Sequence, residues 1–191
     1  MIIINDGSND GSLELLRNYN FIRLLNFYKN RGKGIAIKEG LKRAINEKIL
    51  IFDGDLELNP AQLEQLMILN KDNDIRSVFA NRYNNKMQYK SFWDFGNYFI
   101  SKLFNIIHKS NIKDPLCCAK SFYKTDIIIS NLSSSKFDID VELTIKLLGV
   151  TKNNHNNPIN VKIDYKRRNR NEGKKLKLID TLIILKRIII T

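Results

Sequence analysis

The stretch Ile49-Leu50-Ile51-Phe52-Asp53-Gly54-Asp55-Leu56-Glu57 decides the fold class, because a wholly apolar run leads directly into three alternating acids. A short apolar run without polar alternation is typical of a strand that is buried on both faces, as in a parallel sheet. Carboxylate oxygens suit hard divalent cations such as Mg²⁺ and Mn²⁺, and substrate phosphates usually complete the coordination shell. Asp53 and Asp55, with Glu57 beside them, are therefore candidate metal ligands. A solvated acidic turn is the alternative that these residues leave open.

Strand-like and helix-like patterns alternate around this stretch. The expected elements are strands at 2–4, 21–27 and 49–52, helices at 12–19 and 35–46, and a further helix for which Asn59 suits the N-cap and Pro60 the first position. This alternation predicts an α/β domain with a mostly parallel sheet flanked by helices. Ligands of such sheets lie at the carboxyl ends of the strands. We therefore expect the polar loops 5–8 and 53–57 to share one binding crevice.

Two glycine loops follow the first two expected strands. In the loop Asn5–Ser12, Asp6 can accept hydrogen bonds from a nucleobase or ribose, although a plain capped turn is the alternative. The loop Asn30-Arg31-Gly32-Lys33-Gly34 places glycines and cations before a helix, which suits contact with phosphate. It lacks the spacing of a P-loop.

The second half of the chain is less regular. The expected elements are a strand at 77–80, helices at 91–108 and 137–148, a polar loop at 114–122, an edge strand at 161–165 and an apolar segment at 176–190. The length of 191 residues fits a single domain, and 43% hydrophobic residues exclude a disordered chain.

The net charge of +12, from 32 Lys and Arg against 20 Asp and Glu, favours an anionic partner. Nucleic acid, an anionic membrane surface and a phosphorylated substrate all fit the charge. Nucleic acid is disfavoured because no recognised binding motif is found and because acids cluster at a strand end. The only cysteines, Cys117 and Cys118, are adjacent and indicate no disulfide framework. We find no signal peptide and no apolar run of about 18 residues, so we expect a cytoplasmic enzyme.

Taken in order, these motifs resemble those of the family 2 glycosyltransferases. That family has an Asp-Asp-Gly-Ser-x-Asp-Gly-Ser/Thr turn, an Asn-x-Gly-x-Gly loop and an Asp-x-Asp after the third strand. Asn5 replaces the first Asp of the turn, while Asp53 and Asp55 match the metal motif. Four later segments, at 81–83, 114–122, 137–143 and 168–175, are similar to those of dolichyl-phosphate glucosyltransferases and their bacterial polyprenyl-phosphate relatives.

The resemblance implies a GT-A-type, Rossmann-like fold and an inverting transfer of a hexose. The donor would be a nucleoside diphosphate sugar, UDP-glucose or GDP-mannose, and the acceptor a polyprenyl or dolichyl phosphate. The implied roles are Mg²⁺ or Mn²⁺ binding by Asp53, Asp55 and Glu57, donor binding by Asp6 and Lys33, and acceptor phosphate binding by Arg82, with Lys90 as a second basic candidate. Were the acceptor a hydroxyl, Asp114 would be the base to test.

Two departures from the family pattern matter. The opening strand, which ends in a Pro-x-x-Asn-Glu turn, is missing before Met1, so we expect an unpaired strand edge and an open nucleotide site. Cys118 stands where the family has Gly, and a positive φ there would be strained. A surface-polysaccharide acceptor and an inactive fragment remain the alternative interpretations.

We therefore expect one domain over residues 1–191. Residues 1–80 form the nucleotide-sugar half, 81–175 the acceptor half and 176–191 an amphipathic helix. Basic residues from Arg167 to Lys177 and apolar residues beyond them predict peripheral contact with the cytoplasmic face of a membrane. An ordinary core-packing helix is the alternative for the last segment.

Overall fold

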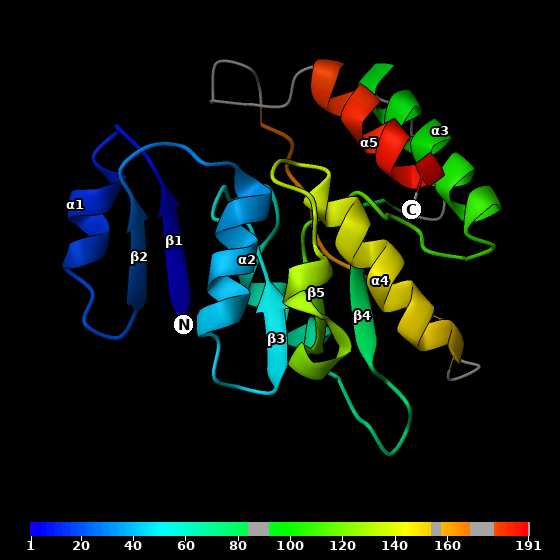
Figure 1. Ribbon diagram of the computed structural model, residues 1–191, viewed down its shortest axis with the longest axis horizontal. Helices are drawn as coiled ribbons and strands as arrows, with labels where there is room; N and C mark the ends of the chain where they lie inside the picture. The colour runs from blue at the N-terminus through cyan, green and yellow to red at the C-terminus, as the bar shows by residue number, and fades with distance from the viewer. Residues whose placement is uncertain (84–91, 154–157, 169–177, 191) are drawn as a thin grey trace.

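The computed structural model describes residues 1–83, 92–153, 158–168 and 178–190. Its elements are β1 (Ile2–Asp6), α1 (Ser12–Arg17), β2 (Arg23–Phe27), α2 (Lys33–Arg43), β3 (Lys48–Ile51), the 3₁₀ helix η1 (Pro60–Leu66), β4 (Ser77–Asn81), α3 (Phe92–Ile107), β5 (Lys120–Tyr123), the short 3₁₀ turns η2 (Lys124–Asp126) and η3 (Ile129–Asn131), α4 (Ile139–Asn153), β6 (Ile159–Lys162) and α5 (Leu178–Ile190). In Figure 1, α2 and α4 lie in front of the strands, and α3 and α5 lie together beyond α4.

The strands form two sheets. β1 and β2 pair in parallel, and the second sheet has the order β3-β5-β4-β6. β5 is antiparallel to both of its neighbours and β6 is parallel to β4, so β3, β4 and β6 run in one direction. This confirms the α/β class with mostly parallel strands. Among the described residues no pairing joins β1 to β3, so each has an edge without a strand partner, as expected.

Most predicted elements agree with the structure except at their ends. The strand before Asp53, β3, was expected to be buried on both faces, and this was wrong: it lies at the edge of its sheet and is only partly buried. Asn59 does cap a helix, because its side chain accepts a hydrogen bond from the N–H of Ala61 at 3.1 Å, but the element is a 3₁₀ helix. The helix expected at 137–148 begins at Ile139 and continues to Asn153. The edge strand expected at 161–165 is at 159–162, because pairing with β4 stops at Lys162. β6 is an edge strand, as predicted.

The core has two layers, and β4 separates them. All five residues of β4 are buried, so both faces of this strand are covered. Phe79 packs into the cluster formed with α3, α4 and α5, which includes Phe104 and Ile188. Val78 and Ala80 point to the other face and pack with η1 and β6. Because β4 is covered on both faces, its position in the sheet is fixed, and so is the position of the residues that directly follow Asn81.

Glu142, on the first turn of α4, fixes the loop that precedes this helix. Its carboxylate accepts hydrogen bonds from the backbone N–H groups of Ser133 and Ser134, both at 2.9 Å, and the side chain is 2% exposed. Burial raises the pKa of Glu142, but these N–H donors outweigh it and bring the pKa below its ordinary value.

We expect Glu142→Gln to lower the free energy of unfolding by about 1–3 kcal/mol at pH 7, because the amide NH₂ would face a backbone donor. A lowered carboxyl pKa contributes stability above its unfolded pKa, and the contribution is lost as the pH falls through the folded pKa. The difference between the two proteins should therefore shrink on acidification below the ordinary glutamate pKa. Urea denaturation at several pH values measures this, and a difference that grows on acidification would contradict it.

Candidate functional site

Asp6, at the carboxyl end of β1, holds the glycine loop that follows β2. Its two carboxylate oxygens accept hydrogen bonds from the backbone N–H groups of Arg31, at 2.7 Å, and Gly32, at 3.0 Å. Beneath it, Asn5 pairs with Asn26 across the strands at 2.8 Å. The family resemblance implied that Asp6 contacts the nucleoside. The structure gives the carboxylate a loop-positioning role in addition, and nucleoside contact remains a prediction.

The glycines of this region allow three chain segments to approach one another. Gly7 has a φ of +72°, and a Cβ there would lie 2.5 Å from the backbone N of Asn30. Gly32 has a φ of +97°, and its Cβ would lie 2.3 Å from the carbonyl oxygen of Ser135. Both positions therefore exclude other residues. Close approach brings the start of α2 against the loop that leads to α4.

Lys33, the first residue of α2, joins two carboxylates from distant parts of the chain. Its Nζ lies 2.6 Å from Asp53 Oδ2, just after β3, and 2.7 Å from Asp140 Oδ2, at the start of α4. Burial would lower the pKa of Lys33, but the two carboxylates more than offset it and hold the pKa well above its usual range. We define Lys33, Asp53 and Asp140 as the acid–lysine cluster.

The two acids of the cluster differ. Burial opposes ionisation of Asp53, but the Lys33 ammonium outweighs it, and the pKa of Asp53 is lowered. Burial dominates at Asp140 and raises its pKa, despite the attraction of Lys33 and Lys120. Asp140 Oδ1 is buried and has no hydrogen-bond partner. Buried carboxylate oxygens are normally satisfied, so this oxygen marks a place where a proton or a ligand is expected.

Sequence reasoning missed Asp140. The segment 137–143 was assigned to a helix start, without a role for its second acid. Lys120 was missed as well: its ammonium is buried and donates to the carbonyl oxygen of Asp140 at 2.7 Å and to Thr144 Oγ1 at 3.0 Å. The sequence offered little signal for this role, because residues 114–122 were expected to form a polar loop, whereas Lys120 begins the buried strand β5 and needs acceptors there.

Asp55 and Glu57 are bound by an arginine from the far end of the chain. Arg168 NH2 lies 2.8 Å from Asp55 Oδ2, and the backbone N–H of Arg168 donates to Glu57 Oε1 at 3.1 Å. Between the two acids, Leu56 has a φ of +57°, a conformation that costs a non-glycine residue about 1 kcal/mol. Strain of this kind persists where the surrounding structure fixes it, and it is often found at functional sites. Each of the three predicted metal ligands thus contacts a basic residue.

The two predicted acceptor-site residues, Arg82 and Asp114, form an ion pair with each other. Arg82 Nε and NH2 donate to the two oxygens of Asp114 at 2.7 and 2.9 Å, and the Asp114 side chain is fully buried. The guanidinium also lies over the rings of Tyr83 and Tyr165. Burial would lower the pKa of Arg82, but Asp114 more than offsets it. The predicted roles of Arg82 at the acceptor phosphate and of Asp114 as a base stay predictions. Lys90 lies outside the described residues.

We expect Asp114→Asn to lower the free energy of unfolding by about 1–3 kcal/mol, because the buried guanidinium loses a charged acceptor. The value of kcat should change by less than about tenfold, since both oxygens already serve Arg82. Denaturation and steady-state kinetics on the same preparation measure both effects. A base role would instead lower kcat by about 10²- to 10⁴-fold, and that result would contradict the ion-pair assignment.

Cys118 fits its position without strain. It is not among the described residues with positive φ, so the strain considered for a residue in place of Gly is not found. The hydrogen bond with Cys117, together with burial and the nearby Asp53 carboxylate, raises the pKa of the Cys118 thiol well above its usual range. The thiol is therefore neutral and weakly nucleophilic.

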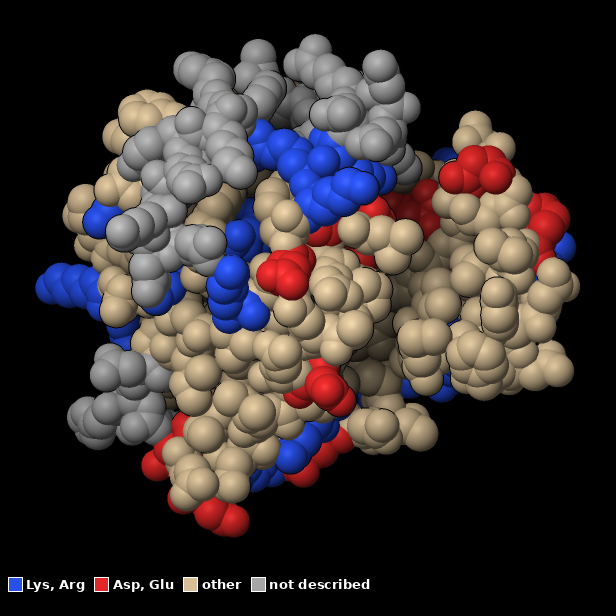
Figure 2. All heavy atoms as spheres, turned by 180° about the vertical axis from the view of Figure 1, so that it is seen from behind, with Lys and Arg blue, Asp and Glu red and all other residues tan. Residues whose placement is uncertain are grey.

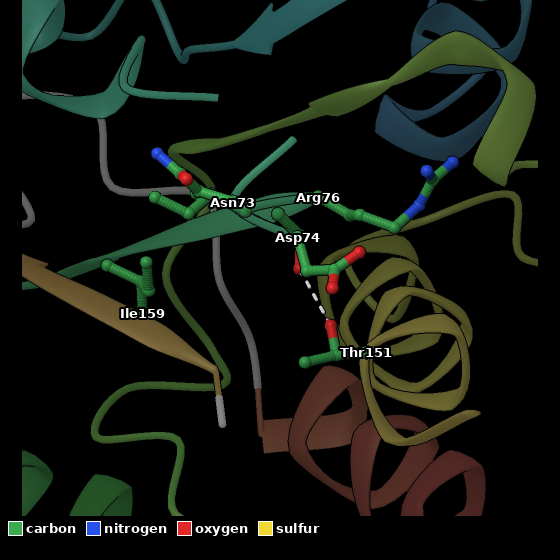
Figure 3. A pocket seen from close by; sticks show the side chains of 7 residues that line it. Asn73, Asp74, Arg76, Thr151 and Ile159 are labelled. Carbon is green, nitrogen blue, oxygen red and sulfur yellow. Dashed lines mark hydrogen bonds between the residues drawn. The ribbon is translucent and has the colours of Figure 1, made fainter. Parts of the chain in front are cut away.

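The surface has one hollow beside the candidate site and another at a different end of the sheet. Figure 2 shows acidic atoms in a recess between the β1–β2 part of the chain and the larger sheet, bordered by basic side chains. A shallow hollow of about 320 Å³ lies beside Glu57 and is lined also by Asn59, Tyr165 and Lys166. The hollow in Figure 3, of about 130 Å³, is lined by Asp74, Arg76 and Thr151 near the start of β4, whereas Arg82 follows the end of that strand.

The donor atoms around Asp53 suit a hard cation. Within the described part of the chain, no group of three or more His, Cys, Asp or Glu side chains is arranged as a complete metal cage. Mg²⁺ and Mn²⁺ do not need one, because one or two carboxylates and the phosphates of a substrate suffice. The carboxylate oxygens of Asp53 and Asp55, which follow β3, are donors of the kind that such an ion prefers.

Comparison with known proteins identifies the family of this chain. Residues 1–128 match the sequence profile described as Glycosyl transferase family 2. The chain is 41% identical over 70 residues to a dolichyl-phosphate beta-glucosyltransferase of Trichomonas vaginalis, covering 35% of this chain and 21% of that protein. It is 39% identical over 59 residues to a poly-beta-1,6-N-acetyl-D-glucosamine synthase of Staphylococcus epidermidis, covering 29% of this chain and 14% of that one. The chain thus spans about a fifth or less of the length of these relatives.

The fold is that of solved sugar transferases. Glucosyl-3-phosphoglycerate synthase of Mycobacterium tuberculosis, in complex with UDP, superimposes with a TM-score of 0.68 at 14% identity, covering 98% of this chain and 65% of that one. The predicted GT-A architecture is therefore confirmed. With its profile match over residues 1–128, its GT-A fold and its acids at the strand ends, this chain belongs to glycosyl transferase family 2.

Proposed function

We propose that the protein transfers a hexose, with inversion, from a nucleoside diphosphate sugar to a polyprenyl or dolichyl phosphate. UDP-glucose and GDP-mannose are the donors to test. The observation that carries the proposal is the acid–lysine cluster, in which Asp53 and Lys33 meet at the carboxyl end of β3. The similarity to a dolichyl-phosphate glucosyltransferase supports the lipid acceptor.

At the donor, Asp53 and Asp55, assisted by Glu57, would hold Mg²⁺ or Mn²⁺. The related synthase was crystallised with Mn²⁺ and UDP-glucose, which supports this choice of ion. A divalent ion held there would supply positive charge that neutralises the diphosphate leaving group. In the structure Lys33 binds Asp53 and Arg168 binds Asp55. We propose that these two cations bind the phosphate oxygens of the donor. Asp6 holds the glycine loop in the shape that receives the nucleotide.

At the acceptor, Arg82 is the proposed phosphate ligand, because guanidinium binds phosphate in a bidentate way. A phosphate acceptor is ionised near neutral pH and requires no protein base. We place the enzyme at the cytoplasmic face of a membrane, where a lipid phosphate is found, and we propose no nucleic-acid partner. The structure shows no described helix that is long and apolar enough to span a bilayer.

A second candidate is transfer to a sugar hydroxyl. The similarity to a polysaccharide synthase favours it, and a hydroxyl acceptor needs a base. Asp140 is better suited than Asp114, because Asp140 keeps one oxygen without a partner and has a raised pKa. Acceptor assays with polyprenyl phosphate and with short glucan chains separate the two candidates.

Calorimetry with UDP-glucose, with and without Mn²⁺, tests the donor site. The proteins to compare are the wild type, Asp55→Ala and the control Asp72→Asn, which removes an exposed charge elsewhere. We expect binding that needs Mn²⁺, persists in the control and is lost in Asp55→Ala. If a folded wild-type chain binds neither UDP-glucose nor GDP-mannose, the proposal is wrong and the inactive-fragment interpretation is correct.

A further inference from the structure

The outer surfaces of α3 and α5 carry the same residue pattern. On α3 the exposed residues include Phe95, Phe99, Lys102 and Ile106, and on α5 they include Ile179, Leu182, Lys186 and Ile189. The spacings of three and four residues place each set on one side of its helix. Each set thus contains three large apolar side chains and one lysine, and Ile107 and Ile190 at the ends of the two helices are exposed as well. We call the eight residues of the two sets the outer face.

The inner sides of both helices point into one core, so their outer sides face the same exterior. Phe104 of α3 and Ile188 of α5 are fully buried in the same cluster, and His108, just after α3, lies 3.1 Å from the carbonyl oxygen of Ile188. Figure 1 shows the two helices together at the edge of the molecule, beyond α4. The helix α5 is therefore a core-packing helix on one side, and its other side is available for a different contact.

The exposed area of the outer face is large for a surface in water. Phe99 is 58% exposed, Ile106 73% and Leu182 61%. Scattered apolar residues are normal on protein surfaces, whereas large apolar side chains gathered on two helices in contact with each other are typical of an interaction site. The outer face contains two lysines and no acid. Asp180 of α5 is buried, and Asp94 of α3 pairs with Arg167 at 2.6 Å.

From this pattern we propose that the outer face binds an anionic lipid bilayer. Large apolar side chains enter the boundary between headgroups and acyl chains, and lysines pair with anionic headgroups. A second copy of the chain is the less suitable occupant, because a two-fold contact would bring together two faces that both carry positive charge and no acid. Charge complementarity therefore favours the lipid surface.

The outer face is also tied to the candidate site. Arg167 pairs with Asp94 in the first turn of α3, and its neighbour Arg168 pairs with Asp55 at 2.8 Å. Two consecutive arginines thus join the helix to the predicted metal ligands. Arg167 and Arg168 were predicted to attract a membrane surface, and in the structure each is held in an ion pair within the protein, while the basic residues at 170–177 lie outside the described residues. A lipid-linked acceptor held at the outer face would stand beside the donor site.

The biological use of this membrane contact rests on the proposed lipid acceptor, but the test of membrane binding needs neither the donor nor the acceptor. Failure of vesicle binding is therefore separable from failure of the UDP-glucose titration. The probes are vesicles of phosphatidylcholine alone and vesicles that also contain phosphatidylglycerol, assayed by co-sedimentation with the wild-type chain. We expect binding to the anionic vesicles and much weaker binding to the neutral ones.

Two variants test the two components of the face. Phe99→Ser with Leu182→Ser should weaken binding by at least about tenfold, because each side chain still has more than half of its surface to bury. Lys102→Gln with Lys186→Gln should weaken it by about fivefold per lysine. The matched controls, Phe21→Ser with Ile45→Ser and Lys29→Gln with Lys162→Gln, change exposed residues elsewhere and should bind like the wild type.

Three results would overturn the proposal. They are equal binding to neutral and anionic vesicles, equal loss in the control variants, and no binding by a chain whose circular dichroism shows it to be folded. Light scattering after size exclusion gives a fourth. A dimer that Phe99→Ser with Leu182→Ser converts to a monomer would assign the outer face to a second copy of the chain.

Discussion

Replacing Asp53 by Asn is expected to lower kcat by about a thousandfold while the protein stays folded. The substitution keeps the shape of the side chain and removes the charge that would hold the divalent ion. Lewis-acid stabilisation of a leaving group is worth several kcal/mol, and about 4 kcal/mol corresponds to a thousandfold. Lys33 keeps its second partner, Asp140, at 2.7 Å, so the buried ammonium is not left without a carboxylate. Steady-state hexose transfer at saturating Mn²⁺ measures the effect.

The control for this experiment is Asp72→Asn, which makes the same change in charge at an exposed position outside the site. Its kcat should equal that of the wild type within about twofold. Titration with Mn²⁺ adds a second readout, because Asp53→Asn should raise the Mn²⁺ concentration needed for half-maximal rate. A variant that keeps its full rate at low Mn²⁺ would show that Asp53 is not a metal ligand.

The fold was predictable because local chemistry and tertiary structure agree along most of the chain. The apolar run before Asp53 predicted the strand β3, although β3 is only partly buried and lies at the edge of its sheet. Gly32 and Gly34 approach the backbone of the segment 134–135 so closely that a side chain would not fit there. The motif order then gave the family. Strand and helix ends differed by a few residues, because pairing partners rather than local propensity decide where a strand stops.

The partners of the site residues were not predictable in the same way. Asp53 and Asp140 are far apart in the sequence and come together at Lys33, because α2 packs against α4 and the residues after β3 reach the same lysine. Periodicity places each acid on its element, but it carries no information on which lysine lies between them. The pairing of Arg82 with Asp114 was missed for the same reason, although both residues had been singled out. Residue type is local information, and ion pairing is a property of the assembled fold.

Replacing Lys33 by Met is expected to lower the free energy of unfolding by about 3–5 kcal/mol, the largest effect on stability that we predict. Removing one partner of a buried ion pair leaves an uncompensated charge, and here two carboxylates, those of Asp53 and Asp140, would lose their common cation. The remaining positive neighbour is Lys120, which bonds to the backbone carbonyl of Asp140. Urea denaturation at pH 7 measures the loss.

Two further measurements decide whether charge is the cause. Without the lysine, burial raises the folded-state pKa of both acids above the unfolded value, so each protonates more readily in the folded chain. A raised acid pKa makes the penalty largest at high pH, and the deficit of Lys33→Met should shrink as the pH falls toward 5. The double variant Lys33→Met with Asp140→Asn should recover part of the loss at pH 7, because it removes the more deeply buried of the two carboxylate charges. A deficit that is independent of pH and unchanged in the double variant would mean that Lys33 stabilises the fold by packing alone, and that the acid–lysine cluster is not an electrostatic unit.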